Sequence, residues 1–204
     1  MLGCTQRALC ALALFSPALT SSSCAATHVG DAESGAAPIY VSEDGSYRLE
    51  LPQGWKRSGQ TLTRDGWEQQ TISFNAGRVA QDGDRPIDAS APGFFQALQE
   101  ELTSQTGVEV VECGPTEIDG VAGFRMHFLR PEALPDESDE KQSSAGGNAP
   151  QREYLTYGVL ADGMLFVFSY EAPAGDGFAR DLAVFERMVR SFQRSPTPPG
   201  AKAQ

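Results

Sequence analysis

The chain has 204 residues, of which 40% are hydrophobic and 21% are charged, and its formal net charge at pH 7 is −11. This length suits one ordinary globular domain, and so acidic a chain argues against a binding surface for nucleic acid or for an anionic membrane. The sequence contains no CxxC pair, no zinc-ligand spacing and no P-loop.

The first 26 residues have the order of features found in an export signal. Arg7 is the only charge before an apolar stretch at 8–19, and small residues occupy 21–26. The apolar stretch is too short for a transmembrane helix. We therefore expect residues 1–26 to direct export and residues 27–38 to form a flexible leader. Loss of Arg7 with the signal changes the net charge from −11 to −12.

Two processing routes fit the end of this signal. Cys24 resembles the cysteine of the bacterial lipobox, which becomes the acylated first residue of a lipoprotein. The lipobox has Leu three residues before the cysteine, where this chain has Ser21. Ordinary cleavage after Ala25 or Ala26 would instead release a periplasmic protein. We expect a lipid anchor at Cys24 and a location in the bacterial envelope, with the unanchored periplasmic form as the alternative.

The remaining cysteines predict no disulfide framework. Cys4 and Cys10 leave with the signal, Cys24 would carry the lipid, and Cys113 is left. The exported domain must therefore gain its stability from an apolar core.

The first half of the domain is predicted to contain short strands and one helix. Residues 39–41 and 47–51 alternate apolar and polar side chains, and 61–63 and 70–74 flank an Asp65-Gly66 turn, which predicts a hairpin.

A helix is expected next, from an N-cap at Ser90 to about Gln105, with Gly107 closing it. Its apolar stripe has helical spacing and contains Phe94, Phe95, Leu98 and Leu102.

The second half is predicted to be rich in strands, at 108–112, 116–118, 121–129, 154–160 and 164–170. Asp162-Gly163 is the clearest hairpin turn. The strand after it is apolar on both faces and should be central and covered on both sides. Residues 131–151 form an acidic insertion without apolar periodicity, which predicts a mobile loop.

The last predicted element is a helix capped by Asp176, from Gly177 to about Gln193. Its buried stripe contains Phe178, Leu182, Phe185, Val189 and Phe192, and residues 195–204 form a disordered tail. The order of elements predicts a single α+β domain at 39–194, with a mainly antiparallel sheet between helices.

Short motifs in this domain resemble the Mog1/PsbP-like superfamily. Residues 47–55, which end in Pro-Gln-Gly-Trp, are similar to the family's opening strand and P-x-G-W turn, and 118–125 are similar to its central strand, which ends in Arg. The hairpin at 154–170 and the helix that contains Phe178 match its closing elements. The resemblance implies an αβα sandwich that has no shared active site and acts as an interaction module.

The partners of that superfamily do not carry over to this chain. Its plant and cyanobacterial members attach to photosystem II, and its eukaryotic branch binds a small GTPase. The sequence has no residue-level match to either binding surface, and the acidic insertion is not a family element.

Catalysis is not predicted. Cys113 and His127 are the candidate nucleophile and base, but Cys113 fits a buried structural thiol, and His127 shares a strand face with Arg125, which predicts a solvated or ion-paired side chain. His28 lies in the leader, and there is no Gly-x-Ser-x-Gly motif. We expect no catalytic residue and no enzyme.

Metal binding is not predicted either. Two acidic groups could hold a divalent cation, but both fit solvated charge runs better, and neither has the EF-hand spacing: Asp82, Asp84 and Asp88; Asp136, Glu137, Asp139 and Glu140. We expect no cofactor.

Four aromatic residues are candidates for a binding face: Trp55, Trp67, Tyr154 and Tyr157. The sequence thus predicts a non-catalytic, lipid-anchored envelope domain that binds an envelope protein of unknown identity. The alternative is a periplasmic protein that binds a small molecule or a divalent metal.

Overall fold

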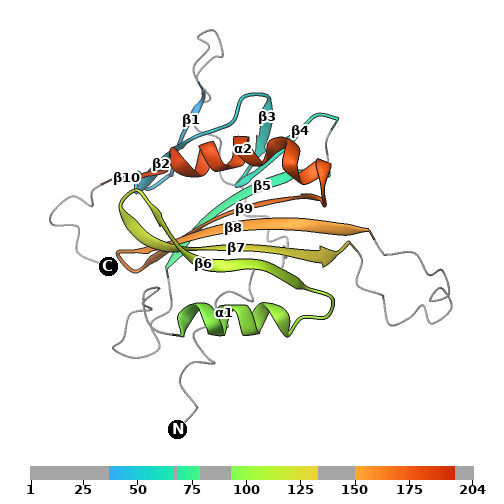
Figure 1. The fold of residues 1–204 in the computed structure, drawn as a ribbon. Coiled ribbons are helices and arrows are strands. Elements are labelled where there is room, and N and C mark those ends of the chain that lie inside the picture. Colours follow the sequence, from blue (N-terminus) through green and yellow to red (C-terminus); the bar gives the residue numbers. More distant parts are fainter. Residues whose placement is uncertain (1–36, 67–68, 79–92, 133–149, 196–204) are drawn as a thin grey trace.

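The computed structural model describes residues 37–66, 69–78, 93–132 and 150–195, and Figure 1 shows how they are arranged. The elements in chain order are β1 (Ile39–Val41), β2 (Tyr47–Glu50), β3 (Trp55–Ser58), β4 (Thr61–Arg64), β5 (Thr71–Arg78), α1 (Phe94–Thr103), β6 (Glu109–Ile118), β7 (Val121–Pro131), β8 (Gln151–Ala161), β9 (Met164–Pro173), α2 (Asp176–Arg190) and β10 (Gln193–Arg194).

The strands form two antiparallel sheets. The larger has seven strands in the order β3-β4-β5-β9-β8-β7-β6, and the smaller has three in the order β1-β2-β10. Helix α2 packs on one face of the larger sheet at β9, whereas α1 packs on the other face at β6 (Figure 1). The predicted α+β architecture is confirmed, and the two helices cover offset parts of the sheet.

The core lies mainly between α2 and the sheet. Phe178, Phe185 and Met188 of α2 are buried against Phe168 and Tyr170 of β9. A smaller cluster lies under α1 and is built from Leu98, Phe124 and Met126. Each fully buried side chain of this size contributes roughly 1.5–3 kcal/mol to folding.

Strand β9 contributes to both sides of this core. Phe166, Phe168 and Tyr170 face the α2 side, and Leu165 packs against the cluster under α1. The prediction of a central strand covered on both faces is therefore confirmed.

Two Asp-Gly pairs turn the chain back between long strands. Asp119 and Gly120 have φ angles of 53° and 70°, and Asp162 and Gly163 have φ angles of 52° and 72°. Two successive positive φ angles are typical of the type I′ turn, whose twist matches that of the strands. These turns join β6 to β7 and β8 to β9, and the second is the predicted hairpin.

Both helices begin and end elsewhere than predicted. The N-cap of α1 is Gly93, so the prediction of a cap at Ser90 is wrong. The N-cap of α2 is Gly175, and Asp176 lies in its first turn, where a carboxylate favours the helix dipole. The last helix ends at Arg190 because residues 193–194 pair with β2.

The strands also differ from their predicted limits. The residues predicted as two strands around Gly114-Pro115 form the single strand β6, with an irregularity in the pairing between Val110 and Glu112. An edge strand tolerates Pro115 because its outer backbone groups need no partner strand. Strand β3 was not predicted. Pro131 and Gln151, the limits of the predicted insertion, pair with each other in the sheet, while residues 133–149 lie outside the described residues.

Two buried tyrosines predict a loss of stability at alkaline pH. Burial raises the pKa of Tyr47 and of Tyr170 above the ordinary value of 10.0. The folded state therefore keeps these protons at a pH where the unfolded chain releases them. Their contribution to stability is intact below pH 10 and falls above it, by up to about 1.4 kcal/mol per pH unit for each tyrosine.

Urea unfolding between pH 9 and pH 12 measures this loss. The variant with Tyr47→Phe and Tyr170→Phe should lose less stability over that range than the unsubstituted chain. Equal slopes for the two proteins would contradict the assignment to these side chains.

Candidate functional site

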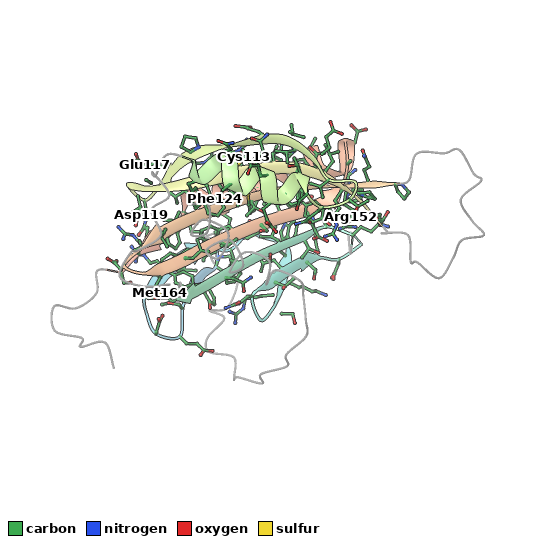
Figure 2. The ribbon with its side chains drawn as sticks, turned by 90° about the horizontal axis from the view of Figure 1, so that it is seen from below. Cys113, Glu117, Asp119, Phe124, Arg152 and Met164 are labelled. Atoms are coloured by element: carbon green, nitrogen blue, oxygen red, sulfur yellow. The ribbon has the colours of Figure 1, made fainter. Side chains whose placement is uncertain are left out.

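The sheet separates the candidate nucleophile from the candidate base. Cys113 pairs with Met126 in the register and packs in the cluster under α1, where Figure 2 also shows Phe124. His127 points to the other face and stacks on Phe178 of α2, with ring centroids 5.3 Å apart. Burial, followed by the charge of Glu112, raises the pKa of the Cys113 thiol. Cys113 and His127 therefore do not form a catalytic pair.

Two of the four aromatic candidates lie on opposite faces of the sheet. Tyr154 stacks on Phe128, with ring centroids 4.9 Å apart, whereas Tyr157 contacts Phe185 of α2 from the opposite face. Trp55 packs against the main core, and Trp67 lies outside the described residues. Binding by any one of these residues stays a prediction.

A group of polar side chains does come together on the α2 face of the sheet. We call it the α2-side polar cluster; it comes from β6, β7, β8 and α2 and consists of Glu112, Arg125, His127, Glu153, Tyr157 and Glu186. The alternation of β7 sends Arg125 and His127 to this face together, as the sequence predicts.

Arg125 is the centre of one half of the cluster. Its Nε donates to the Tyr157 hydroxyl at 3.2 Å, and its guanidinium forms an ion pair with Glu112. The Tyr157 hydroxyl in turn donates to Glu186 Oε1 of α2 at 3.5 Å. Burial alone would lower the pKa of Arg125, but the contacts with Tyr157 and Glu112 outweigh it and raise the pKa. The guanidinium therefore stays charged.

Glu153 is the centre of the other half. Its Oε1 lies 2.6 Å from His127 Nε2, and its Oε2 accepts a hydrogen bond of 3.2 Å from the backbone N–H of Gly175. Gly175 caps the N-terminus of α2, where the helix dipole favours a negative charge. His127 thus lies in a polar, hydrogen-bonded position, as its strand face predicts. The contacts of Glu153 join β7 and β8 to the start of α2.

The surface beside Arg125 has little side-chain cover. The main contacts of helix α2 are with β9, and they do not include β6. Gly114 lies opposite Arg125 in the register, and no atom of the described residues, its chain neighbours aside, lies within 4 Å of where its Cβ would be. Arg125 retains 23% side-chain exposure, and its partner Glu112 retains 57%. This half of the cluster is accessible from solvent.

The cluster is suited to binding by hydrogen bonds and charge. Arg125 and the three carboxylates are held by each other, by Tyr157, by His127 or by the backbone N–H of Gly175. Within the described ranges, no group of three or more His, Cys, Asp or Glu residues is placed to hold a metal ion. The acidic groups at 82–88 and 136–140 lie outside those ranges.

Comparison with known proteins connects this fold to others. No family model matches the chain, and no curated protein matches it in sequence. Cyanobacterial PsbP (CyanoP) from Synechocystis sp. PCC 6803 superposes with a TM-score of 0.51 over 83% of this chain and 98% of that protein, at 12% identity. The chain has the Mog1/PsbP-like fold.

A second solved structure shares the Mog1/PsbP-like fold at a similar level. LpqN, which is involved in cell envelope biogenesis of Mycobacterium tuberculosis, has a TM-score of 0.51 and 15% identity over 78% of this chain and 90% of that protein. The Ran-binding protein Mog1p of Saccharomyces cerevisiae has a lower TM-score, 0.44, at 13% identity over 76% of this chain and 94% of that protein. The superpositions with CyanoP and LpqN, at 12% and 15% identity, show a common fold alone.

The two described helices, α1 and α2, have 10 and 15 residues. Neither of them is both long enough and apolar enough to cross a membrane.

Proposed function

We propose that this chain is a non-catalytic, exported domain of the bacterial envelope, anchored by a lipid at Cys24, which binds another envelope protein through the α2-side polar cluster. The observation that carries the proposal is the state of Arg125. Its guanidinium is charged, mostly buried and hydrogen-bonded to the Tyr157 hydroxyl, whereas its ion-pair partner Glu112 is largely exposed.

An arginine with these contacts is already positioned to bind a partner. Arg and Tyr are enriched among the residues that dominate binding energy at protein interfaces. An exposed ion pair contributes little to stability, at most about 1 kcal/mol. A carboxylate or backbone carbonyl of a partner can therefore replace Glu112 at low cost, and the open surface at Gly114 leaves room for it.

The envelope location is supported by the signal and by one structural relative. Residues 1–26 have the features of an export signal, and Cys24 lies where a lipoprotein cysteine would lie. LpqN, which shares the fold, is involved in cell envelope biogenesis. Intact-mass measurement of the mature protein tests the anchor directly, since an acylated Cys24 is expected at its N-terminus.

Site-specific crosslinking in cells tests the binding surface. A photoreactive amino acid at Thr116, which lies on β6 two residues from Gly114, should give a discrete crosslinked product with an envelope protein. Arg125→Ala should reduce that product at least about fivefold, a loss typical of an interface residue that contributes 1 kcal/mol or more.

Lys56→Ala is the matched control, because Lys56 is also ion-paired, with Asp65, but lies on β3 at the other edge of the sheet. It should leave the product unchanged. An equal yield from the Arg125→Ala variant, or the absence of any product at Thr116, would refute the proposed binding surface.

A further inference from the structure

The outer face of β1 carries exposed apolar side chains. Ile39 is 60% exposed and Val41 is 56% exposed. Among the described residues, the only other large hydrophobic side chain with comparable exposure is Val111, at 52%. Tyr40, between the two, turns inward and contacts Tyr47 and Phe74. Strand β1 therefore has one face in the core and one apolar face in solvent.

This strand is also the first described element after the leader. It forms an edge of the three-stranded sheet and projects from the α2 side of the molecule in Figure 1. Ile39 follows Cys24 by 15 residues. Even a fully extended chain of that length spans no more than about 50 Å. A lipid on Cys24 would thus keep β1 within that distance of the bilayer surface.

The size of the apolar face favours lipid over a protein as its occupant. A stable protein interface buries about 800 Å² on each partner, which two side chains of this size cannot supply. An anchored domain needs a far smaller buried area for its second contact with the membrane. The lipid already holds the domain there, so the second contact is effectively intramolecular.

We propose that the outer face of β1, formed by Ile39 and Val41, rests against the lipid surface to which the domain is anchored. This inference rests on the lipid anchor of the proposed function. The apolar side chains of Ile39 and Val41 supply the contact, and Arg48 and Glu50, which lie beside Val41 and Ile39 in the register, carry opposite charges and add no net charge to this face. With a net charge of −12, the mature chain gains nothing from anionic lipids.

The contact would orient the α2-side polar cluster. Strand β2, the neighbour of β1, meets the C-terminal end of α2, where the backbone N–H of Glu50 donates to Ser191 Oγ at 2.8 Å. His127 and Glu153 lie at the opposite end, beside Gly175 and Phe178. The 15 residues of α2 span about 22 Å. Contact at β1 therefore holds the His127–Glu153 half of the cluster away from the lipid, whereas the Arg125 half, which meets α2 at Glu186, lies between the two ends.

Lipid-dependent quenching of a single probe tests this orientation. The full chain is purified from membranes with Cys113→Ser and Val41→Cys, labelled with an environment-sensitive fluorophore, and reconstituted in phosphatidylcholine vesicles that contain nitroxide lipids. Val111→Cys in the same background is the matched control, because Val111 is equally apolar and similarly exposed but lies on β6. Quenching at position 41 should exceed quenching at 111 by about threefold or more, as for a residue in the interfacial region.

The outcomes separate this inference from the proposed function. An acylated protein with equal quenching at 41 and 111 would overturn the membrane contact and leave the anchor intact. A mass without an acyl group would overturn both. Shielding of the probe at 41 that rises with protein concentration in the absence of vesicles would show that a second copy covers β1, which also overturns the inference. Quenching should not change when phosphatidylglycerol replaces part of the phosphatidylcholine; a strong increase would contradict the apolar contact.

Discussion

Gly123→Ala is expected to destabilise the folded domain by about 3 kcal/mol, at the upper end of the range for overpacking. A Cβ on Gly123 would overlap the backbone carbonyl oxygen of Gly158 in the neighbouring strand β8 and would lie 3.4 Å from Val159 Cγ2. A backbone oxygen cannot move aside as a flexible side chain can. Strands β7 and β8 must therefore separate, which disturbs Phe124 and Met126 beneath them.

Gly114→Ala is the matched control for this prediction. Gly114 also lies in a strand, and its Cβ position has no atom of the described residues within 4 Å apart from those of its chain neighbours. Because glycine in a strand costs roughly 0.5–1 kcal/mol relative to alanine, this variant should be neutral or slightly more stable. Urea unfolding measures the free energy of unfolding of both variants. In thermal unfolding, the Gly123 variant should lose about 6–12 °C in Tm. Similar stabilities for the two variants would show that the close approach of β7 and β8 at Gly123 does not limit the side chain at that position.

The hairpins could be predicted from the sequence because their determinants are local. Each Asp-Gly pair favours the positive φ angles of a type I′ turn, and alternation in the flanking residues then determines which side chains face the core. The limits of the helices could not be predicted in this way. The last helix stops at Arg190 because Gln193 and Arg194 pair with β2, a contact with residues almost 150 positions earlier in the chain.

The candidate site was predictable only in part. Alternation alone places Arg125 and His127 on one face, and it also separates Tyr154 from Tyr157, which are an odd number of residues apart on one strand. The partners Glu112, Glu153 and Glu186 depend on strand register and on where α2 crosses the sheet. Nothing in the local sequence marks these carboxylates among the 27 acidic residues of the chain.

A large loss of stability is also expected when Arg64 is replaced. Asp181 of α2 is buried, with 4% side-chain exposure, and its Oδ1 lies 3.1 Å from the Arg64 guanidinium on β4. Its Oδ2 has no hydrogen-bond partner in the described structure. Arg64→Met removes the cation and leaves a buried carboxylate without compensation. Breaking a buried ion pair in this way costs about 3–5 kcal/mol, and the 42% exposure of Arg64 suggests the lower end of that range.

A double variant separates two contributions to the free energy of unfolding: the destabilisation by an unpaired buried charge and the net stabilisation by the ion pair. Arg64→Met combined with Asp181→Leu replaces both partners by apolar side chains of similar size, and it should recover to within about 1 kcal/mol of the unsubstituted chain. Lys56→Met, which breaks the exposed pair with Asp65, should change the free energy of unfolding by less than about 1 kcal/mol. If Arg64→Met alone lowers the free energy of unfolding no more than Lys56→Met does, Arg64 is not needed to stabilise the buried charge of Asp181. The attachment of α2 to the β4–β5 side of the sheet must then rest on apolar packing and on the 2.7 Å hydrogen bond from Gln70 Nε2 to the Gly177 carbonyl oxygen.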